Sequence, residues 1–143
     1  MNFKKLLVLL LFAIAIIGII APVNANLEAF SGIYELNKGK AKVYLYVNSN
    51  IGSNAKDYDS ANYVSKRKAE LNNVNKVVVS IKGYTPKNFK KPSKGWKTGK
   101  YGDQFEKIFS VKGNPLGKSY SIKLYNKNNK LLKQVNGKAL PGN

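Results

Sequence analysis

Residues 76–82 read KVVVSIK, the most strand-like stretch of this sequence. Its apolar residues are all β-branched, which favours an extended backbone. Val77, Val79 and Ile81 share one face of such a strand, and Val78 lies on the other. A strand that is apolar on both faces is typical of the interior of a sheet. We therefore expect a β-rich fold with this segment inside a sheet.

Residues 40–48, KAKVYLYVN, alternate between apolar and polar side chains, as a strand with one buried face does. The predicted core face holds Ala41, Val43, Leu45 and Val47. The opposite face is a ladder of Lys40, Lys42, Tyr44 and Tyr46. Because tyrosine has a high strand propensity, we interpret this ladder as a solvated sheet surface.

Four further segments have strand character, with turn residues between them: 30–36, 104–111, 119–125 and 130–135. About six short strands, one helix and no regular alternation of strands and helices predict a mainly β fold. We expect an antiparallel sandwich, immunoglobulin-like in the broad sense, with one short helix. The alternative is an α+β fold in which the helix covers one face of a sheet.

Residues 60–72 are predicted to form the helix, because they are rich in helix formers and contain neither glycine nor proline. Asp59 precedes them as the expected N-cap. A narrow face of Ala61, Val64, Lys68 and Leu71 falls at helical spacing and can pack on a sheet. We expect Lys66 and Arg67 to be solvated.

The first 25 residues have the features of a signal peptide. Lys4 and Lys5 precede 15 apolar residues, 6–20, and residues 23–25, VNA, fit a cleavage site. The alternative is an uncleaved membrane anchor, although the apolar run is shorter than the roughly 18 to 20 residues that span a bilayer. We expect a secreted or cell-surface protein that touches the membrane only if this segment is retained.

Residues 26–143 are predicted to form a single β-rich domain. Two of the 25 basic residues lie in the signal peptide, so this part carries 23 basic and seven acidic residues, a net charge of +16. Such a charge attracts anionic partners and opposes self-association, and we expect a monomer. The alternative is that the lysine content is compositional and serves only solubility. All basic residues but one are lysine, which lacks the planar fork that reads bases, so we expect no specific nucleic-acid binding.

Residues 84–101, YTPKNFKKPSKGWKTGKY, form the longest interruption between predicted strands, with six lysines, four aromatic residues and no carboxylate. We expect an exposed basic loop whose lysines attract a polyanion while its aromatic rings stack on bases or sugar faces. The candidate ligand-binding residues are Lys87, Phe89, Lys90, Lys91, Lys94, Trp96, Lys97, Lys100 and Tyr101. The alternative is that Trp96 anchors the loop in the core and the lysines only solvate it.

The sequence contains no histidine and no cysteine, which removes the usual zinc ligands, thiol nucleophiles and the commonest general base. Residues 57–68 begin like a calcium loop but end on a lysine where a bidentate glutamate is needed. Asp103 and Glu106 would point to opposite faces of a strand, which does not suit a catalytic carboxylate pair. Residues 95–101 lack the glycine spacing of a phosphate-binding loop. We expect no enzymatic activity, no cofactor and no metal site.

Four stretches resemble small exported proteins of methanogenic archaea with polysaccharide-rich walls: 82–86 (KGYTP), 90–96 (KKPSKGW), 113–115 (GNP) and 120–125 (YSIKLY). The resemblance covers about residues 57–137. It implies a location in the cell envelope, and it implies no activity and no role for any residue.

Export, the net charge and the acid-free loop together favour a non-catalytic cell-surface protein that binds an anionic wall polymer or glycan. A second hypothesis is a secreted cationic effector that acts on membranes or neighbouring cells. Such an effector needs a surface that inserts apolar groups, and no strongly amphipathic basic helix is evident. A third hypothesis is a structural module whose charge serves only solubility.

Overall fold

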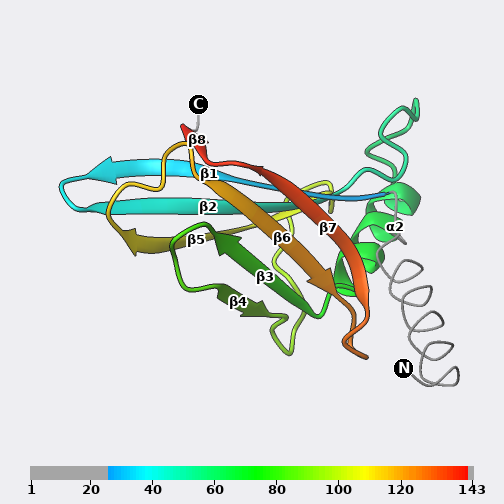
Figure 1. Ribbon diagram of the computed structural model, residues 1–143. Coiled ribbons are helices and arrows are strands. Elements are labelled where there is room, and N and C mark those ends of the chain that lie inside the picture. The colour runs from blue at the N-terminus through cyan, green and yellow to red at the C-terminus, as the bar shows by residue number, and fades with distance from the viewer. Residues whose placement is uncertain (1–25, 142–143) are drawn as a thin grey trace, which may run out of the picture.

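The computed structural model describes residues 26–141, which form two four-stranded sheets packed face to face and one helix (Figure 1). The helix lies at one end of the sandwich, and the turn between the first two strands lies at the opposite end (Figure 1). The predicted signal peptide, residues 1–25, lies outside the described residues.

The first sheet has the strand order β5-β2-β1-β8. Its strands are β1 (Leu27–Asn37), β2 (Lys40–Ser49), β5 (Gln104–Lys112) and β8 (Leu140–Pro141). Strand β2 pairs antiparallel with both β1 and β5, whereas the short β8 runs parallel to β1. The last described residues therefore add a two-residue edge strand to this sheet.

The second sheet has the strand order β4-β3-β6-β7, and all of its pairs are antiparallel. Its strands are β3 (Lys76–Ile81), β4 (Lys87–Lys90), β6 (Ser119–Tyr125) and β7 (Leu131–Lys138). Strand β3 lies between β4 and β6, which confirms the prediction that the valine-rich segment is an interior strand.

The core fills the space between the two sheets, and both contribute alternate residues of their strands. From the first sheet come the four residues predicted from the alternation in residues 40–48, all of them buried: Ala41, Val43, Leu45 and Val47. Val77, Val79, Ile122 and Leu124 face them from the second sheet. The predicted mainly β antiparallel sandwich with one short helix is confirmed over the α+β alternative.

Strand β1 begins three residues earlier than predicted. Leu27 and Ala29 continue its inward alternation and are buried, and Leu27 pairs with Ser49 at the end of β2. The two strands therefore form a longer hairpin than the sequence indicated. It reaches beyond the second sheet at its turn (Figure 1).

The helix α2 covers Ala61–Asn72 and confirms the predicted helix. Its N-cap is Ser60 rather than Asp59, because the Ser60 hydroxyl accepts a hydrogen bond from the Tyr63 amide at 3.4 Å. The expectation that Arg67 is solvated is wrong, since its side chain is fully buried. Three backbone carbonyls surround its guanidinium, as described below, and their hydrogen bonds replace those with water.

The predicted exposed loop, residues 84–101, is only partly a loop. Residues Lys87–Lys90 form the edge strand β4, which pairs with β3 from Lys76↔Lys90 to Val79↔Lys87. The remaining residues lead from β4 along the end of helix α2 to β5. This region is therefore anchored at several points rather than projecting into solvent.

Candidate functional site

Trp96 is the main anchor of the segment between β4 and β5. Its side chain is 5% exposed, and its Nε1 donates a hydrogen bond to the Val74 carbonyl at 2.7 Å. The indole lies parallel to the ring of Phe105 with centroids 4.2 Å apart. The expectation that Trp96 stacks on a ligand is wrong, because the ring has no free face. The alternative, a core anchor, is correct.

Lys91 also has a structural role, because both its side chain and its backbone amide make hydrogen bonds within the fold. Its ammonium donates to the Asn72 carbonyl at 2.7 Å, and its backbone amide donates to the Asn75 carbonyl at 2.8 Å. Asn72 is the last residue of α2, where a lysine both satisfies a free carbonyl and complements the helix dipole. The Asn72 side chain in turn accepts the Trp96 backbone amide at 3.2 Å.

Phe89 is half-buried and packs against the core, with its ring centroid 5.7 Å from that of Phe109. Tyr101 is 37% exposed, and its ring lies 5.8 Å from Tyr58. The other predicted ligand-binding residues are exposed: Lys87, Lys90, Lys94, Lys97 and Lys100. The structure thus makes Trp96, Lys91 and Phe89 structural anchors and leaves Tyr101 and the five other lysines exposed. Among these, the Lys100 ammonium lies 5.3 Å from the Tyr101 ring centroid.

The positive charge is concentrated in one half of the sandwich. The second sheet and its loops fall within residues 71–102 and 113–141, which hold 14 basic residues and no acidic one. Residues 26–70 and 103–112 hold nine basic and seven acidic residues. The net charge of +16 therefore divides into +14 and +2. The acid-free stretches are visible in the sequence, but only the topology shows that all four strands of the second sheet come from them.

The outer side of the second sheet is what we call the basic face. The strand register places Lys90, Lys76 and Tyr125 in one row across β4, β3 and β6. Lys123 and Gln134 belong to the next row. Further residues on this side, all uncharged except the last, are Val78, Ser80, Asn88, Ser119, Ser121, Asn136 and Lys138. The face therefore offers ammonium, amide and hydroxyl groups over a flat surface.

Two depressions belong to the same half of the molecule. One, about 550 Å³, opens on the basic face and is lined by Ser80, Ser119, Tyr120, Ser121, Asn136, Gly137 and Lys138. The other, about 390 Å³, lies where the second sheet meets the end of α2 and is lined by Asn72, Asn73, Lys91, Asn126, Lys127, Asn128 and Leu132. No carboxylate lines either of them, so both suit anionic or hydroxyl-rich groups.

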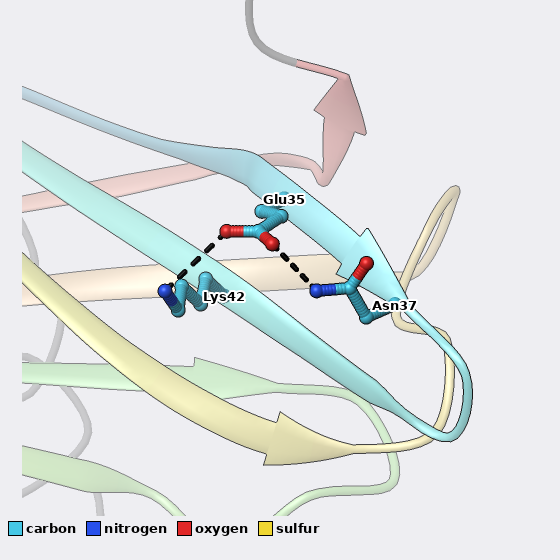
Figure 2. Close-up of polar contacts among 3 residues, drawn as sticks. All are labelled: Glu35, Asn37 and Lys42. Carbon is cyan, nitrogen blue, oxygen red and sulfur yellow. Dashed lines mark hydrogen bonds and ion pairs between the residues drawn. The ribbon is translucent and has the colours of Figure 1, made fainter.

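The carboxylates of the first sheet are placed differently. Glu35 forms an ion pair with Lys42 at 3.3 Å and accepts a hydrogen bond from the Asn37 side chain (Figure 2). The hydrogen bond from Asn37, followed by the contact with Lys42, lowers the pKa of Glu35. On this exposed surface the lysine charge is compensated locally, which is not the case anywhere on the basic face.

Among the described residues, no group of three or more carboxylates could hold a metal ion. In residues 26–141 no helix is long and apolar enough to cross a membrane.

Comparisons with known proteins add little. No family model and no curated protein matches the chain. A solved structure, a domain of the outer membrane lipoprotein Omp28 from Porphyromonas gingivalis, matches with a TM-score of 0.37 and 14% sequence identity, over 83% of this chain and 92% of that chain. A likeness this low assigns no function to this chain. The resemblance to exported proteins of methanogenic archaea stays a prediction.

Proposed function

We propose that this chain is a non-catalytic, exported cell-surface module that binds an anionic envelope polymer or glycan through its basic face. One observation carries the proposal. The strands of the second sheet and the turns that join them, residues 76–90 and 119–138, hold nine lysines without a single carboxylate. A compositional excess of lysine has no reason to leave every acidic residue in the other half of the fold.

The contact differs from the one expected from the sequence. Lys90 remains in it, and it is joined by Lys76 and Lys123 from the neighbouring strands. Lys76 is held in place, since its ammonium lies 4.8 Å from the Tyr125 ring centroid and 3.0 Å from the Asn129 side-chain oxygen. Lys94, Lys97 and Lys100 follow β4 in the sequence and are also exposed.

The chemistry of the face suits a repeating anion. Lysine supplies a hydrated point charge without strict geometry, which fits a polymer whose charged groups bind in several registers. The hydroxyl and amide side chains between the lysines can hydrogen-bond to sugar or phosphate oxygens. Rows of a sheet repeat at about 7 Å along a strand, a spacing that several charged groups of an extended polymer can meet together.

A binding titration tests the proposal with protein beginning at Asn26, which keeps every described element. The probes are a phosphate-bearing polymer, a carboxylated polysaccharide and an uncharged glycan, each at two salt concentrations. The test variant is Lys90→Gln/Lys123→Gln/Lys138→Gln. Its control, Lys56→Gln/Lys66→Gln/Lys68→Gln, removes the same charge from exposed positions in the other half.

We expect the test variant to lose about tenfold in affinity at low salt, with a weaker salt dependence, if each contact contributes about 0.5 kcal/mol. The control should lose far less. Equal losses in the two variants would show that only the net charge matters. Binding of neither anionic probe by the unmodified protein would overturn the proposal.

A further inference from the structure

The outer side of the first sheet carries a contiguous apolar patch, which we call the aromatic face. It consists of Phe30, Tyr44, Tyr46, Ile108 and Leu140. Phe30 is 42% exposed, Ile108 48% and Leu140 60%. The register places Tyr46 beside Phe30 and Tyr44 beside Ile108, so the patch crosses all four strands.

The three rings of the aromatic face contact one another. Phe30 and Tyr46 stack with centroids 5.0 Å apart, and Tyr44 meets Tyr46 edge-on at 5.1 Å. Gly32 provides the room for this cluster, because a Cβ at that position would lie 2.5 Å from the Tyr44 hydroxyl. The glycine lets Tyr44 lie across the strand, and the patch is therefore an ordered surface rather than a set of isolated side chains.

Phe30 and Tyr46 each cover one face of the other's ring, so the cluster offers less uncovered ring face to a sugar than separate rings would. Contiguous exposed apolar surfaces of this kind mark contacts with other proteins, where aromatic residues form the centre and charged residues the rim.

The charges around the patch are arranged in two opposite groups along the strands. Lys40 and Lys112 pair at the end near the β1–β2 turn, beside the Glu35–Lys42 ion pair. Glu106 and Glu28 lie toward the other end, since they pair with Tyr46 and Asn48 of β2. The face therefore has a lysine end, an aromatic centre and a carboxylate end.

We propose that the aromatic face binds a second copy of this chain. A two-fold axis between the faces, running across the strands at the level of Tyr44, sets the carboxylate end of each copy against the lysine end of the other. A two-fold interface must be self-complementary in this way. The rings, Ile108 and Leu140 of both copies then form a shared apolar centre.

The distribution of charge favours this arrangement over any other face-to-face pairing. Residues 26–70 and 103–112, which carry all of the aromatic face except Leu140, have a net charge of +2, so two copies meet there with little repulsion. The basic faces then point away from each other at the two ends of the dimer. The net charge of +16, which led us to expect a monomer, opposes contact through the second sheet only.

The size of the face sets the expected affinity. The nine residues of β2 from Lys40 to Asn48 span about 27 Å along the strand. The three strands β5, β2 and β1, at about 4.8 Å per strand, cover a width of about 14 Å. The product of these two lengths is a flat area of about 400 Å². It does not include the added surface of protruding side chains or the area of β8. Stable dimers bury about 800 Å² per partner, which is more than this face offers. We therefore expect a weak dimer with a dissociation constant in the micromolar range.

The proposed dimer does not depend on the proposed function. One of its consequences does rest on that function. Two outward basic faces would let one dimer hold two polymer segments, and the overall affinity would then exceed that of either face. The oligomeric state is measured without polymer, so its failure and the failure of polymer binding are distinguishable.

Sedimentation equilibrium over a concentration series tests the dimer in protein beginning at Asn26. Glu28→Lys/Glu106→Lys makes both ends of the face basic, and Lys40→Glu/Lys112→Glu makes both ends acidic; each should raise the dissociation constant at least tenfold. The variant with all four changes exchanges the ends and should recover the dimer. Lys66→Glu/Lys68→Glu, on helix α2, is the control and should dimerise normally. Circular dichroism confirms folding of each variant.

A monomer at every concentration would overturn the inference. So would equal effects of the face variants and the control, or a fourfold variant that dimerises no better than its two parents. Recovery in the fourfold variant supports the two-fold arrangement in particular, because only opposed ends regain their charge pairs when both are reversed.

Discussion

The indole of Trp96 and the phenyl ring of Phe105 lie 2° from parallel with their centroids 4.2 Å apart. Trp96 comes from the lysine-rich segment after β4, and Phe105 points inward from β5 of the other sheet. This pair fixes the segment across the end of the sandwich. The loop that the sequence predicted to be exposed is therefore anchored in the core through Trp96.

The buried position of Trp96 predicts its fluorescence. Emission should be blue-shifted and poorly accessible to a soluble quencher, because the indole is surrounded by protein and its Nε1 already donates to Val74. A binding polyanion should change it little, since the ring is not on the basic face. A red-shifted emission that iodide readily quenches would contradict this placement.

Replacing the indole should be costly to the fold. Trp96→Ala should lower the free energy of unfolding by about 3–5 kcal/mol, because it leaves a cavity and an unpaired Val74 carbonyl. Trp96→Phe keeps a ring against Phe105 and should cost less. Denaturant unfolding measures both, with exposed Lys97→Ala as the control, for which we expect a change within about 0.5 kcal/mol.

Arg67 is the chain's one arginine, and it is buried under three carbonyls. Its Nε, Nη1 and Nη2 donate to the carbonyls of Tyr101, Ile51 and Tyr58 at 3.0, 3.0 and 2.6 Å. The guanidinium also lies 3.8 Å from the Tyr58 ring centroid. One side chain thus ties the helix to two loops, the β2–α2 connection at Ile51 and Tyr58 and the β4–β5 connection at Tyr101.

Arg67→Met should therefore destabilise the protein by about 3 kcal/mol, since three carbonyls lose their donor in a buried site. Arg67→Lys should recover little, because a single ammonium cannot reproduce the planar fork. Chemical unfolding provides the measurement. The matched change Lys66→Met, at the exposed neighbouring position, should have almost no effect, and a loss equal to that of Arg67→Met would contradict the assigned role.

Gly102 is buried and has a positive φ of +67°, beside helix α2. A Cβ there would lie 2.8 Å from the Val64 carbonyl oxygen and 2.6 Å from Lys68 Cγ. Gly102→Ala should thus lower the free energy of unfolding by about 1–2 kcal/mol, because alanine is strained in the left-handed region. It should cost more than that, because the added Cβ also displaces the helix.

Gly83→Ala is the control for that change. Gly83 also has a positive φ, +89°, but no atom lies within 4 Å of the added Cβ. Its loss of thermal stability should reflect the strain alone. Equal losses at the two glycines would show that the helix does not press on Gly102.

The Tyr58 hydroxyl donates to the Asp103 carboxylate at 2.7 Å. Burial, then the hydrogen bond to Asp103 and its charge, raise the pKa of Tyr58 above the usual tyrosine value. The folded state thus holds this proton more tightly than the unfolded state does. The resulting stability is complete below about pH 10 and is lost as the pH rises through the raised value.

Tyr58→Phe should make the alkaline fall in stability shallower, while costing about 1 kcal/mol near neutral pH for the lost hydrogen bond. Asp103→Asn should lower the pKa of Tyr58, because it removes the negative charge that opposes ionisation. Tyrosinate absorbance against pH follows the second effect. An unchanged titration in Asp103→Asn would contradict the assigned cause.

Much of the fold could be predicted from local patterns. The alternation in residues 40–48 and the β-branched run in residues 76–82 identified one core face and one interior strand correctly. The helix was found from its composition, with its cap misplaced by one residue. These features depend on side chains two to four positions apart, so the sequence shows them directly.

The candidate site was harder to predict, because the sequence does not show which aromatic residue is buried. Trp96 and Tyr101 lie in the same lysine-rich segment, yet the first is 5% and the second 37% exposed. Trp96 is buried because its partners, Val74 and Phe105, come from other elements. No spacing within the segment encodes that contact.

By itself, the sequence determined the strand-forming segments, the total charge and the lack of histidine and cysteine chemistry. Only the tertiary structure decided that Arg67 is internal, that the second sheet is built from acid-free stretches, and that the tyrosines of β2 complete a face with Phe30 and Ile108. The physical reason is that hydrophobic periodicity is local, whereas desolvation and electrostatic potential depend on which distant segments pair.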